Sequence, residues 1–313
     1  MFSLRQLEYL VTVVDTGSFT RAAALLHVTQ PALSHQVRAL EQQAGGRLLE
    51  RLPRTVRATP MGRALLPHAR AALADAERAR LAARQAVGLD CGELEVATVY
   101  SVALGVLPPA LRAWHRAHPD VRIRLIEHRH VDELAEAMAG GRADVAIGSV
   151  PEGWEGPVRP LGEEEFVLVL PPEDPAAPAG ATGGLLDLAE LADRRWVHYA
   201  PGHGLAEVLD RACAVAGFAP RPAVRTEQTA TAPVLAGAGL GPALTPANTV
   251  PAGIDGVLRW PDPPITRQLV AYTRGEPDPL TAAFLDTLAA ECRPRPAHLV
   301  APRAEPRHPP IRL

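Results

Sequence analysis

A short segment near the N-terminus combines side chains that hydrogen-bond well to base edges in DNA. Gln can pair with adenine, and Arg with guanine, through two hydrogen bonds each, and one such pair is worth about 1–3 kcal/mol of base discrimination. Polar residues recur at helical spacing just after Thr29, so we expect them on the exposed face of one helix. They are Gln30, Ser34, His35 and Arg38. For each of them the alternative of an ordinary solvated side chain stays open.

Four arginines follow in a segment whose pattern predicts a small hairpin. Leu48 to Arg51 and Val56 to Thr59 are expected to form two short strands around Pro53-Arg54. A guanidinium group matches the oxygens of a phosphate, and such a contact needs no base sequence. A run of charge is usually a solvated surface, but its place beside the polar helix favours contact with the DNA backbone. The arginines are Arg47, Arg51, Arg54 and Arg57.

Three short helices would hold the polar segment in place. Ser3, Ser18 and Thr29 are suitable helix N-caps, and Pro31 falls in the first turn of the third helix, where its missing N–H costs little. Two short helices joined by a tight turn form a helix-turn-helix, whose second helix enters the major groove N-terminus first. The residues predicted to contact DNA are Thr29, Gln30, Pro31, Ser34, His35, Arg38, Arg51, Arg54 and Arg57.

The charge of the chain is distributed unevenly. Residues 1–88 hold 12 Arg and 6 acidic residues, whereas residues 89–292 hold 15 Arg and 28 acidic residues. The formal net charge of −3 therefore combines a basic head, net +6, with an acidic body, net −13. This asymmetry is expected when only one end of a protein meets nucleic acid.

Length and composition limit the class of protein. A chain of 313 residues is long enough for two or three domains, and 47% hydrophobic with 21% charged residues is a globular composition. The sequence has no apolar run of membrane-spanning length and no secretory signal pattern at its N-terminus. We therefore expect a cytoplasmic protein without a membrane partner.

Neither metal binding nor catalysis is indicated. Cys91, Cys213 and Cys292 are widely separated, which favours buried thiols, with redox sensing by Cys91 and Cys213 as the weaker alternative. His128 and His130 are too few for a zinc site. The sequence shows no phosphate-binding loop, catalytic carboxylate pair or nucleophile elbow. We therefore expect that the protein is not an enzyme and has no catalytic residue or metal site. The only small molecule that we expect it to bind is a co-inducer.

Residues 4–66 resemble the winged helix-turn-helix of the LysR-type transcriptional regulators almost position by position. The segments FTRAAA, TQPALSHQVRALE and ATPMGRALL carry the likeness, while His35 and Leu49 stand where the family often has Arg and an aromatic residue. The resemblance implies a sequence-specific regulator of double-stranded promoter DNA whose activity a small-molecule effector modulates. Such a regulator could also contact RNA polymerase.

A long helix is expected to follow the hairpin. Thr59 can cap it and Pro60 can begin it, and a run to about Val87 would span roughly 40 Å. Small residues recur along it with a period of 3.5, which is typical of a coiled-coil seam. The seam residues are Leu65, Ala69, Ala72, Ala76, Ala79, Ala83 and Ala86. We expect a homodimer through this helix, and the resemblance adds a tetramer.

The body of the chain alternates short strands with helices, which predicts an α/β fold with a parallel sheet. The expected strands are 94–98, 121–127, 145–148, 166–170, 196–199 and 269–272, and the expected helices 102–117, 131–139, 206–216 and 230–236. The resemblance implies two lobes, like those of periplasmic binding proteins, with crossings near 161–163 and 265–268. The predicted parts are a winged helix-turn-helix (1–59), a linker helix (60–90), an effector domain (91–292; lobe I about 91–162 and 269–292, lobe II about 163–268) and a disordered tail (293–313).

Ligands of such folds bind beyond the carboxyl ends of the strands, where free N–H groups at helix N-termini favour anions. Three strand exits lead into helices, at 100–102, 201–204 and 229–231, so we expect a carboxylate metabolite as effector. Ordinary helix capping is the alternative for each hydroxyl. The family resemblance singles out Ser101. The expected effector-binding residues are Ser101, Val102, Gly148, Pro201, His203 and Thr229.

Two other classes of protein compete with this interpretation. A solute-binding protein or an enzyme could share the two-lobed fold, but neither needs a capped helix-turn-helix with an arginine-rich wing. An effector-independent architectural DNA-binding protein would have no use for the large acidic domain. A DNA-binding regulator therefore explains both the basic helix-turn-helix and the large acidic domain.

Overall fold

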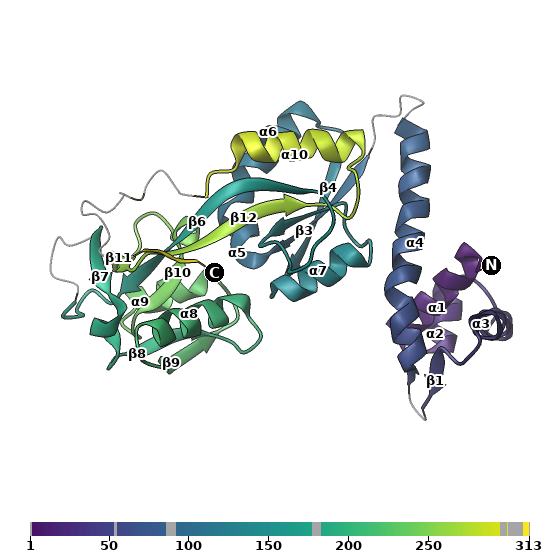
Figure 1. Ribbon diagram of the computed structural model, residues 1–313, viewed down its shortest axis with the longest axis horizontal. Coiled ribbons are helices and arrows are strands. Elements are labelled where there is room, and N and C mark those ends of the chain that lie inside the picture. The colour runs from purple at the N-terminus through teal and green to yellow at the C-terminus, as the bar shows by residue number, and fades with distance from the viewer. Residues whose placement is uncertain are drawn as a thin grey trace. The chain divides into compact units, whose positions relative to one another are not determined.

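The computed structural model describes residues 2–52, 55–85, 92–176, 183–294, 299 and 309–312, without the side chains of 51, 78 and 80–85. The chain divides into two compact units, residues 1–92 with 136–144, and residues 93–135 with 145–313. Figure 1 labels their helices and strands. Because Arg54, Cys91 and Ala86 lie outside the described residues, as do the side chains of Arg51 and Ala83, the predictions about them stay predictions.

The N-terminal unit contains the three expected helices, α1 (Leu4–Thr16), α2 (Phe19–Leu25) and α3 (Gln30–Ala44). Their caps are those the sequence predicts: the hydroxyl oxygens of Ser3, Ser18 and Thr29 each accept a backbone N–H three residues later. Gly17 ends α1 with a φ of 63°, a left-handed conformation that costs glycine little. A hairpin follows, formed by β1 (Leu49–Arg51) and β2 (Val56–Ala58).

The long helix α4 (Pro60–Gln85) begins at the predicted proline. The first residues of the predicted dimer seam on this helix contact the helix-turn-helix of the same chain. Leu65, Ala69 and Ala72 pack into the core of the helix-turn-helix, and Ala69 is buried there. Ala69 is therefore not part of an exposed seam, because the apolar stripe of α4 covers the helix-turn-helix at this residue. Two seam residues with described side chains lie beyond that core. Ala76 is half-buried and Ala79 is exposed.

The C-terminal unit is built around a mixed sheet rather than the expected parallel one. Within the described residues, the order β4-β3-β5-β12-β6-β11-β7 forms a continuous sheet, to which β10 adds at β6 and β13 at β12. The strands are β3 (Glu93–Val99), β4 (Arg122–His128), β5 (Val145–Gly148), β6 (Val158–Leu170), β7 (Gly184–Asp187), β10 (Ala243–Pro246), β11 (Val257–Asp262), β12 (Ile265–Tyr272) and β13 (Ile311–Arg312). A separate pair consists of β8 (Arg195–Tyr199) and β9 (Arg221–Thr226).

Two long strands connect the lobes of this unit. Figure 1 shows β6 and β12 side by side from one lobe to the other, and they pair antiparallel from Thr266 opposite Glu165 to Tyr272 opposite Val158. The parallel prediction failed at these strands because each returns the chain from one lobe to the other. Both predicted crossings fall within them.

Helices cover the sheet, and one predicted helix is interrupted. The expected helix 102–117 is two helices, α5 (Tyr100–Gly105) and α6 (Leu107–Ala117), because Pro108 and Pro109 supply no backbone N–H groups to continue the first. The others are α7 (Val131–Ala139), α8 (Gly204–Val215), α9 (Thr231–Gly237) and α10 (Pro279–Glu291), with the 3-10 turns η1 (Leu188–Leu191) and η2 (Ala247–Thr249).

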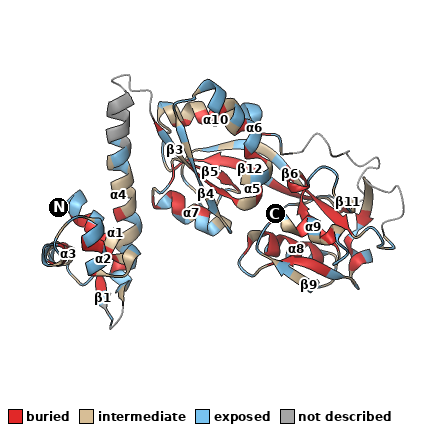
Figure 2. Ribbon diagram, turned by 180° about the vertical axis from the view of Figure 1, so that it is seen from behind, coloured by how far each residue is buried: buried red, intermediate tan, exposed pale blue. Residues whose placement is uncertain are grey.

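Each lobe buries its own apolar side chains. In lobe I, Trp114 of α6 meets Phe284 of α10 edge to face, with ring centroids 5.2 Å apart. In lobe II, Phe166, Trp196 and Tyr199 belong to one continuous core, and Figure 2 shows buried residues along the strands of both lobes. In the tail, where we expected disorder, Ile311 donates its N–H to the carbonyl oxygen of Pro264, so β13 is an ordered exception.

Candidate nucleic-acid interface and ligand cavity

The helix α3 presents most of its predicted DNA-contacting residues to solvent. Leu33, Val37 and Leu40 are buried on its inner side, while His35 and Arg38 are exposed and Gln30 is half-buried. Thr29 and Pro31, at the start of the helix, are also exposed. The leading end of α3 is therefore free to meet a partner.

Ser34 is an exception to the predicted exposed face. Its side chain is buried, with 7% of its surface exposed. Ser34 follows Leu33 and lies one turn before Val37, so it falls at the edge of the inward stripe. The expectation of an exposed Ser34 was wrong for this reason.

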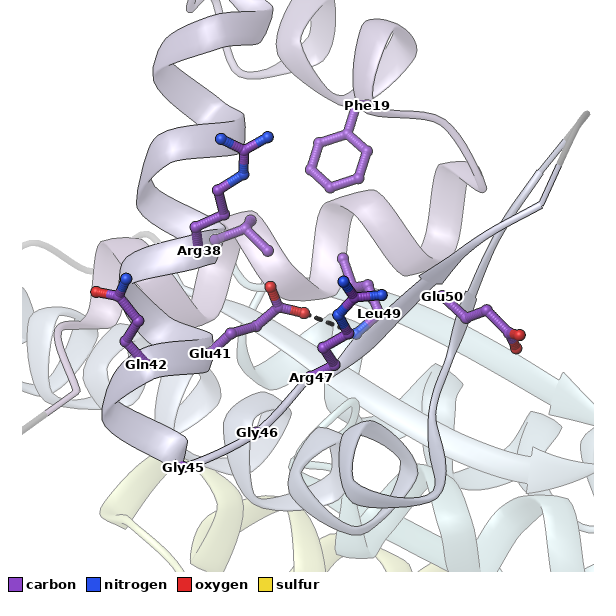
Figure 3. A pocket seen from close by; sticks show the side chains of 10 residues that line it. Phe19, Arg38, Glu41, Gln42, Gly45, Gly46, Arg47, Leu49 and Glu50 are labelled. Atoms are coloured by element: carbon purple, nitrogen blue, oxygen red, sulfur yellow. Dashed lines mark hydrogen bonds between the residues drawn. The ribbon is translucent and has the colours of Figure 1, made fainter.

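A groove of about 940 Å³ separates the C-terminal half of α3 from the hairpin (Figure 3). The carboxylate of Glu41 accepts the backbone N–H groups of Leu48 at 2.9 Å and Leu49 at 3.1 Å, which ties the helix to β1. Arg38 and Arg47 line the groove from the two sides. Arg47 therefore adds to the predicted contact residues a hairpin arginine that the sequence pattern alone did not single out for DNA contact.

In the hairpin, Arg57 is exposed and lies directly opposite Glu50 on the neighbouring strand. Of the three predicted wing contacts, it is the one whose side chain is described. Its exposed guanidinium is available to a phosphate group.

A smaller cavity, of about 230 Å³, lies within the C-terminal unit. Its buried polar lining consists of Ser101, His203 and Arg267, which are 3%, 4% and 7% exposed. Its exposed lining carries the charges of Arg129, Glu207 and Arg211. We call these three buried polar residues the floor of the cavity.

The floor is tied to both long strands by hydrogen bonds. Arg267 donates to Ser101 Oγ at 3.1 Å, and both its Nε, at 2.9 Å, and its Nη2 donate to Glu164 Oε2. Glu164 is fully buried and also accepts from Asn248 Nδ2 at 2.7 Å. One chain of polar groups therefore runs from α5 through β12 and β6 to η2.

His203 enters the floor as the N-cap of α8. Its Nδ1 accepts the N–H of Leu205 at 3.1 Å, which leaves the proton of the neutral ring on Nε2. Nε2 is buried and has no hydrogen-bond partner among the described residues. Burial, and then the positive charges of Arg129 and Arg267, lower the pKa of His203. The neutral ring is thus a hydrogen-bond donor without an acceptor in the described part of the chain.

The exposed side of the cavity is crossed by contacts between the two lobes. Arg129 Nη2 lies 3.2 Å from Glu227 Oε2, and His130 Nε2 lies 3.2 Å from Glu207 Oε2. The backbone N–H of Gly204 donates to the carbonyl oxygen of Arg129 at 3.0 Å. Two consecutive residues of lobe I thus contact three residues of lobe II, and we call these contacts the interlobe latch.

The structure places the predicted effector residues in different environments. Ser101 and His203 line the cavity. Val102, Gly148 and Thr229 are buried but do not line it, and Pro201 is exposed outside it. The lining residues outside the predicted effector-binding set are Val99, Tyr100, Arg129, His130, Val131, Ser149, Gly204, Leu205, Glu207, Val208, Arg211 and Arg267.

Other kinds of site find little support in the described part of the chain. No group of three or more His, Cys, Asp or Glu residues there is arranged to hold a metal ion. None of the helices described has the length and apolar character needed to cross a membrane. Cys213 and Cys292 are buried free thiols.

Residues 4–63 match the family described as bacterial regulatory helix-turn-helix protein, lysR family, and residues 88–293 match the LysR substrate binding domain. The chain is 32% identical to the regulator IlvR of Caulobacter vibrioides, over 90% of this chain and 96% of that protein. It is 32% identical to the regulator ShiR of Corynebacterium glutamicum, over 79% and 83%.

Solved structures of full-length regulators agree with this match. A full-length variant of OxyR from Pseudomonas aeruginosa superposes with a TM-score of 0.73 at 25% identity, covering 96% of this chain and 99% of that one. CbnR complexed with its target DNA gives a TM-score of 0.62 at 27% identity, covering 92% and 99%. The chain belongs to the LysR family of DNA-binding transcriptional regulators, with a helix-turn-helix at its N-terminus and a two-lobed effector-binding domain behind it.

Proposed function

We propose that this regulator reads promoter DNA with the exposed face of α3 and responds to a small carboxylate bound at the floor of its cavity. Base contacts are assigned to Gln30, His35 and Arg38, and backbone contacts to Arg57 and to Arg47 beside the groove. The exposure of His35, Arg38, Arg47 and Arg57 on α3 and beside it supports the assignment. The protein acts by binding alone, in the cytoplasm, as a homodimer or a dimer of dimers, without a catalysed reaction.

The observation that carries the choice of a carboxylate is the chemistry of the floor. Ser101, Arg267 and His203 all present donors, and the Nε2–H of His203 has no acceptor among the described residues. Hydrogen bonds to an ionised acceptor are roughly twice as strong as neutral ones, so a carboxylate is the best-matched small ligand. The apolar lining residues Val99, Leu205 and Val208 suit an uncharged body attached to it.

Regulation then follows from a shift between two arrangements of the molecule. An effector changes an equilibrium only by the difference between its affinities for the two states. Because the cavity is bounded by both lobes, a bound carboxylate stabilises whichever lobe arrangement brings its donors together. The arrangement of the DNA-binding units changes with it.

Electrophoretic mobility shifts with the intergenic DNA upstream of the gene, and with an unrelated duplex, test the DNA part. Gln30→Ala and Arg38→Ala should weaken binding to the specific site by about tenfold or more and leave the unrelated duplex unchanged. Arg57→Ala should weaken both, because a phosphate contact is independent of sequence. Arg124→Ala, in the C-terminal unit, is the control. Unchanged specific binding in both base-contact variants would contradict the assignment.

The effector part is tested by footprinting the same DNA with and without candidate carboxylates. Ser101→Ala should remove the change in footprint while DNA affinity without ligand stays that of the wild type. A Ser101→Ala protein that responds like the wild type would remove Ser101 from the site.

A further inference from the structure

We propose that Arg267 and Glu164 form a positioning pair that aims the floor of the cavity at a carboxylate and links the bound ligand to both lobe-connecting strands. This inference rests on the proposed effector site and adds the residues that organise it. Arg267 would contact the ligand, and Glu164 would act through Arg267.

Burying the charges of Arg267 and Glu164 costs free energy, so the presence of this ion pair needs an explanation. Arg267 is 7% exposed and Glu164 is fully buried. Removing two charges from water is expensive, and replacing a buried ion pair by apolar residues often leaves stability unchanged or improved. A buried pair that borders a cavity is therefore better explained by what it presents there than by stability.

Arg267 determines which way the hydroxyl of Ser101 can act. The Nη2–H of Arg267 donates to Ser101 Oγ at 3.1 Å, so this oxygen is an acceptor toward the arginine. No hydrogen bond donated by the hydroxyl is found within the described residues. Its proton is thus available to a ligand in the cavity that Ser101 lines.

The remaining donors of the floor serve the same acceptor. Nε and Nη2 of Arg267 are engaged by Glu164, while Nη1 makes no hydrogen bond in the described part of the chain. His203 adds its buried Nε2–H. A planar carboxylate, with two oxygens and several lone pairs, can accept from all three groups, whereas an amide offers one oxygen and would bring two N–H donors against them.

The pair also connects the ligand to the junction of the lobes. Arg267 of β12 and Glu164 of β6 are direct cross-strand partners in the sheet ladder. Asn248 of η2 donates to the other oxygen of Glu164, at 2.7 Å, and so includes lobe II in the same chain of contacts. A carboxylate held by Arg267 is thereby connected to both strands that carry the chain between the lobes.

Calorimetric titration of the full chain with phenylacetate and phenylacetamide tests the proposal, because these probes differ only in the group that meets the floor. The wild type should bind phenylacetate about tenfold or more tightly than phenylacetamide, the ratio expected from a charge-assisted hydrogen bond. The double substitution Arg267→Met with Glu164→Gln removes both charges without leaving one unpaired. In this double variant the affinities for phenylacetate and phenylacetamide should differ by no more than about threefold. The single substitution Arg267→Lys, which keeps the positive charge, should retain part of the preference for phenylacetate.

Matched controls separate positioning from folding. Arg124 and Glu95 are also cross-strand partners joined by an ion pair, at 2.8 Å, but they lie on β4 and β3 outside the cavity. Arg124→Met with Glu95→Gln should keep the wild-type preference. Ser101→Ala, introduced alone, should reduce the preference for phenylacetate. In the Arg267→Met, Glu164→Gln background it should have no further effect, because Ser101 and the Arg267–Glu164 pair act on the same ligand together.

The outcomes distinguish this inference from the proposed function. If the wild type shows no preference for phenylacetate, or binds neither probe, the carboxylate effector is wrong and the positioning pair falls with it. If the wild type shows the preference and the double variant keeps it, the carboxylate site stands and the role of Arg267 and Glu164 is overturned.

Discussion

The backbone N–H of Gly204, the first residue of α8, is bonded across the two lobes to the carbonyl oxygen of Arg129. An N–H in the first turn of a helix has no partner within that helix, so its protection from solvent depends on this single contact. The amide of Gly204 is therefore a direct reporter of whether the lobes are in contact at this point.

Hydrogen exchange at Gly204 should depend on the side-chain contacts beside it. Glu207→Gln together with Glu227→Gln removes the charged partners of His130 and Arg129 and leaves the backbone of both lobes intact. We expect exchange of the Gly204 amide to accelerate, since the lobes lose the two side-chain contacts that flank this hydrogen bond. Glu95→Gln, which breaks an ion pair within lobe I, should leave it unchanged. Equal exchange rates in the wild type and the double variant would show that the latch does not hold the lobes.

His203 should make the stability of the effector domain depend on pH. The folded protein lowers the pKa of His203 below its ordinary value of 6.5, so the unfolded chain binds the proton more readily. Stability is then fully present above pH 6.5 and falls as the pH drops from there toward the folded pKa.

His203→Asn should remove this part of the pH dependence, because Asn can cap α8 through its side-chain oxygen without titrating. Thermal unfolding of both proteins between about pH 7.5 and about pH 5 would show it as a smaller decline in the variant. Identical pH profiles would mean that His203 does not contribute.

The exposed part of α4 should carry the dimer contact. Ala79 is exposed in the single chain, whereas Ala69, one of the predicted seam residues, is buried against the helix-turn-helix. Ala79→Glu would place charges against each other in a paired helix and should weaken the dimer at least about tenfold. Sedimentation equilibrium can measure this, with Asp75→Glu as a charge-conserving control on the same helix. A dimer of unchanged affinity would place the interface elsewhere.

The two described thiols should be inert while the protein is folded. Burial raises the pKa of Cys213 to about 12 and that of Cys292 to about 11, so neither forms the reactive thiolate at neutral pH. In a Cys91→Ser background, an aromatic disulfide reagent should label the native protein more slowly than the unfolded chain by several orders of magnitude. Fast labelling of the native variant would contradict the burial of these two thiols.

The sequence predicts the DNA-binding unit better than the ligand site, for a physical reason. Ser3, Ser18 and Thr29 act on backbone groups three residues away, so their roles depend on local spacing alone. Ser101 and His203 could be expected in the same way, since each stands where a strand leads into a helix.

The rest of the floor depends on contacts that are distant in the chain. Arg267 reaches the cavity because β12 pairs with β6 in one register, which brings it opposite Glu164, 103 residues earlier. The family resemblance implied a crossing near this strand, but nothing in the local sequence pattern could assign the register that orients Arg267. Ser34 shows the converse, since its polar type predicted exposure while its position beside Leu33 buried it.

The short strand β13 has a practical consequence for anyone who produces this protein. Ile311 and Arg312 pair with Ile265 and Thr266, the residues that immediately precede Arg267 on β12. A tag or fluorescent protein fused directly after this strand would lie next to the pairing partners of Ile265 and Thr266, so reporters and purification handles are better placed at a site remote from β13.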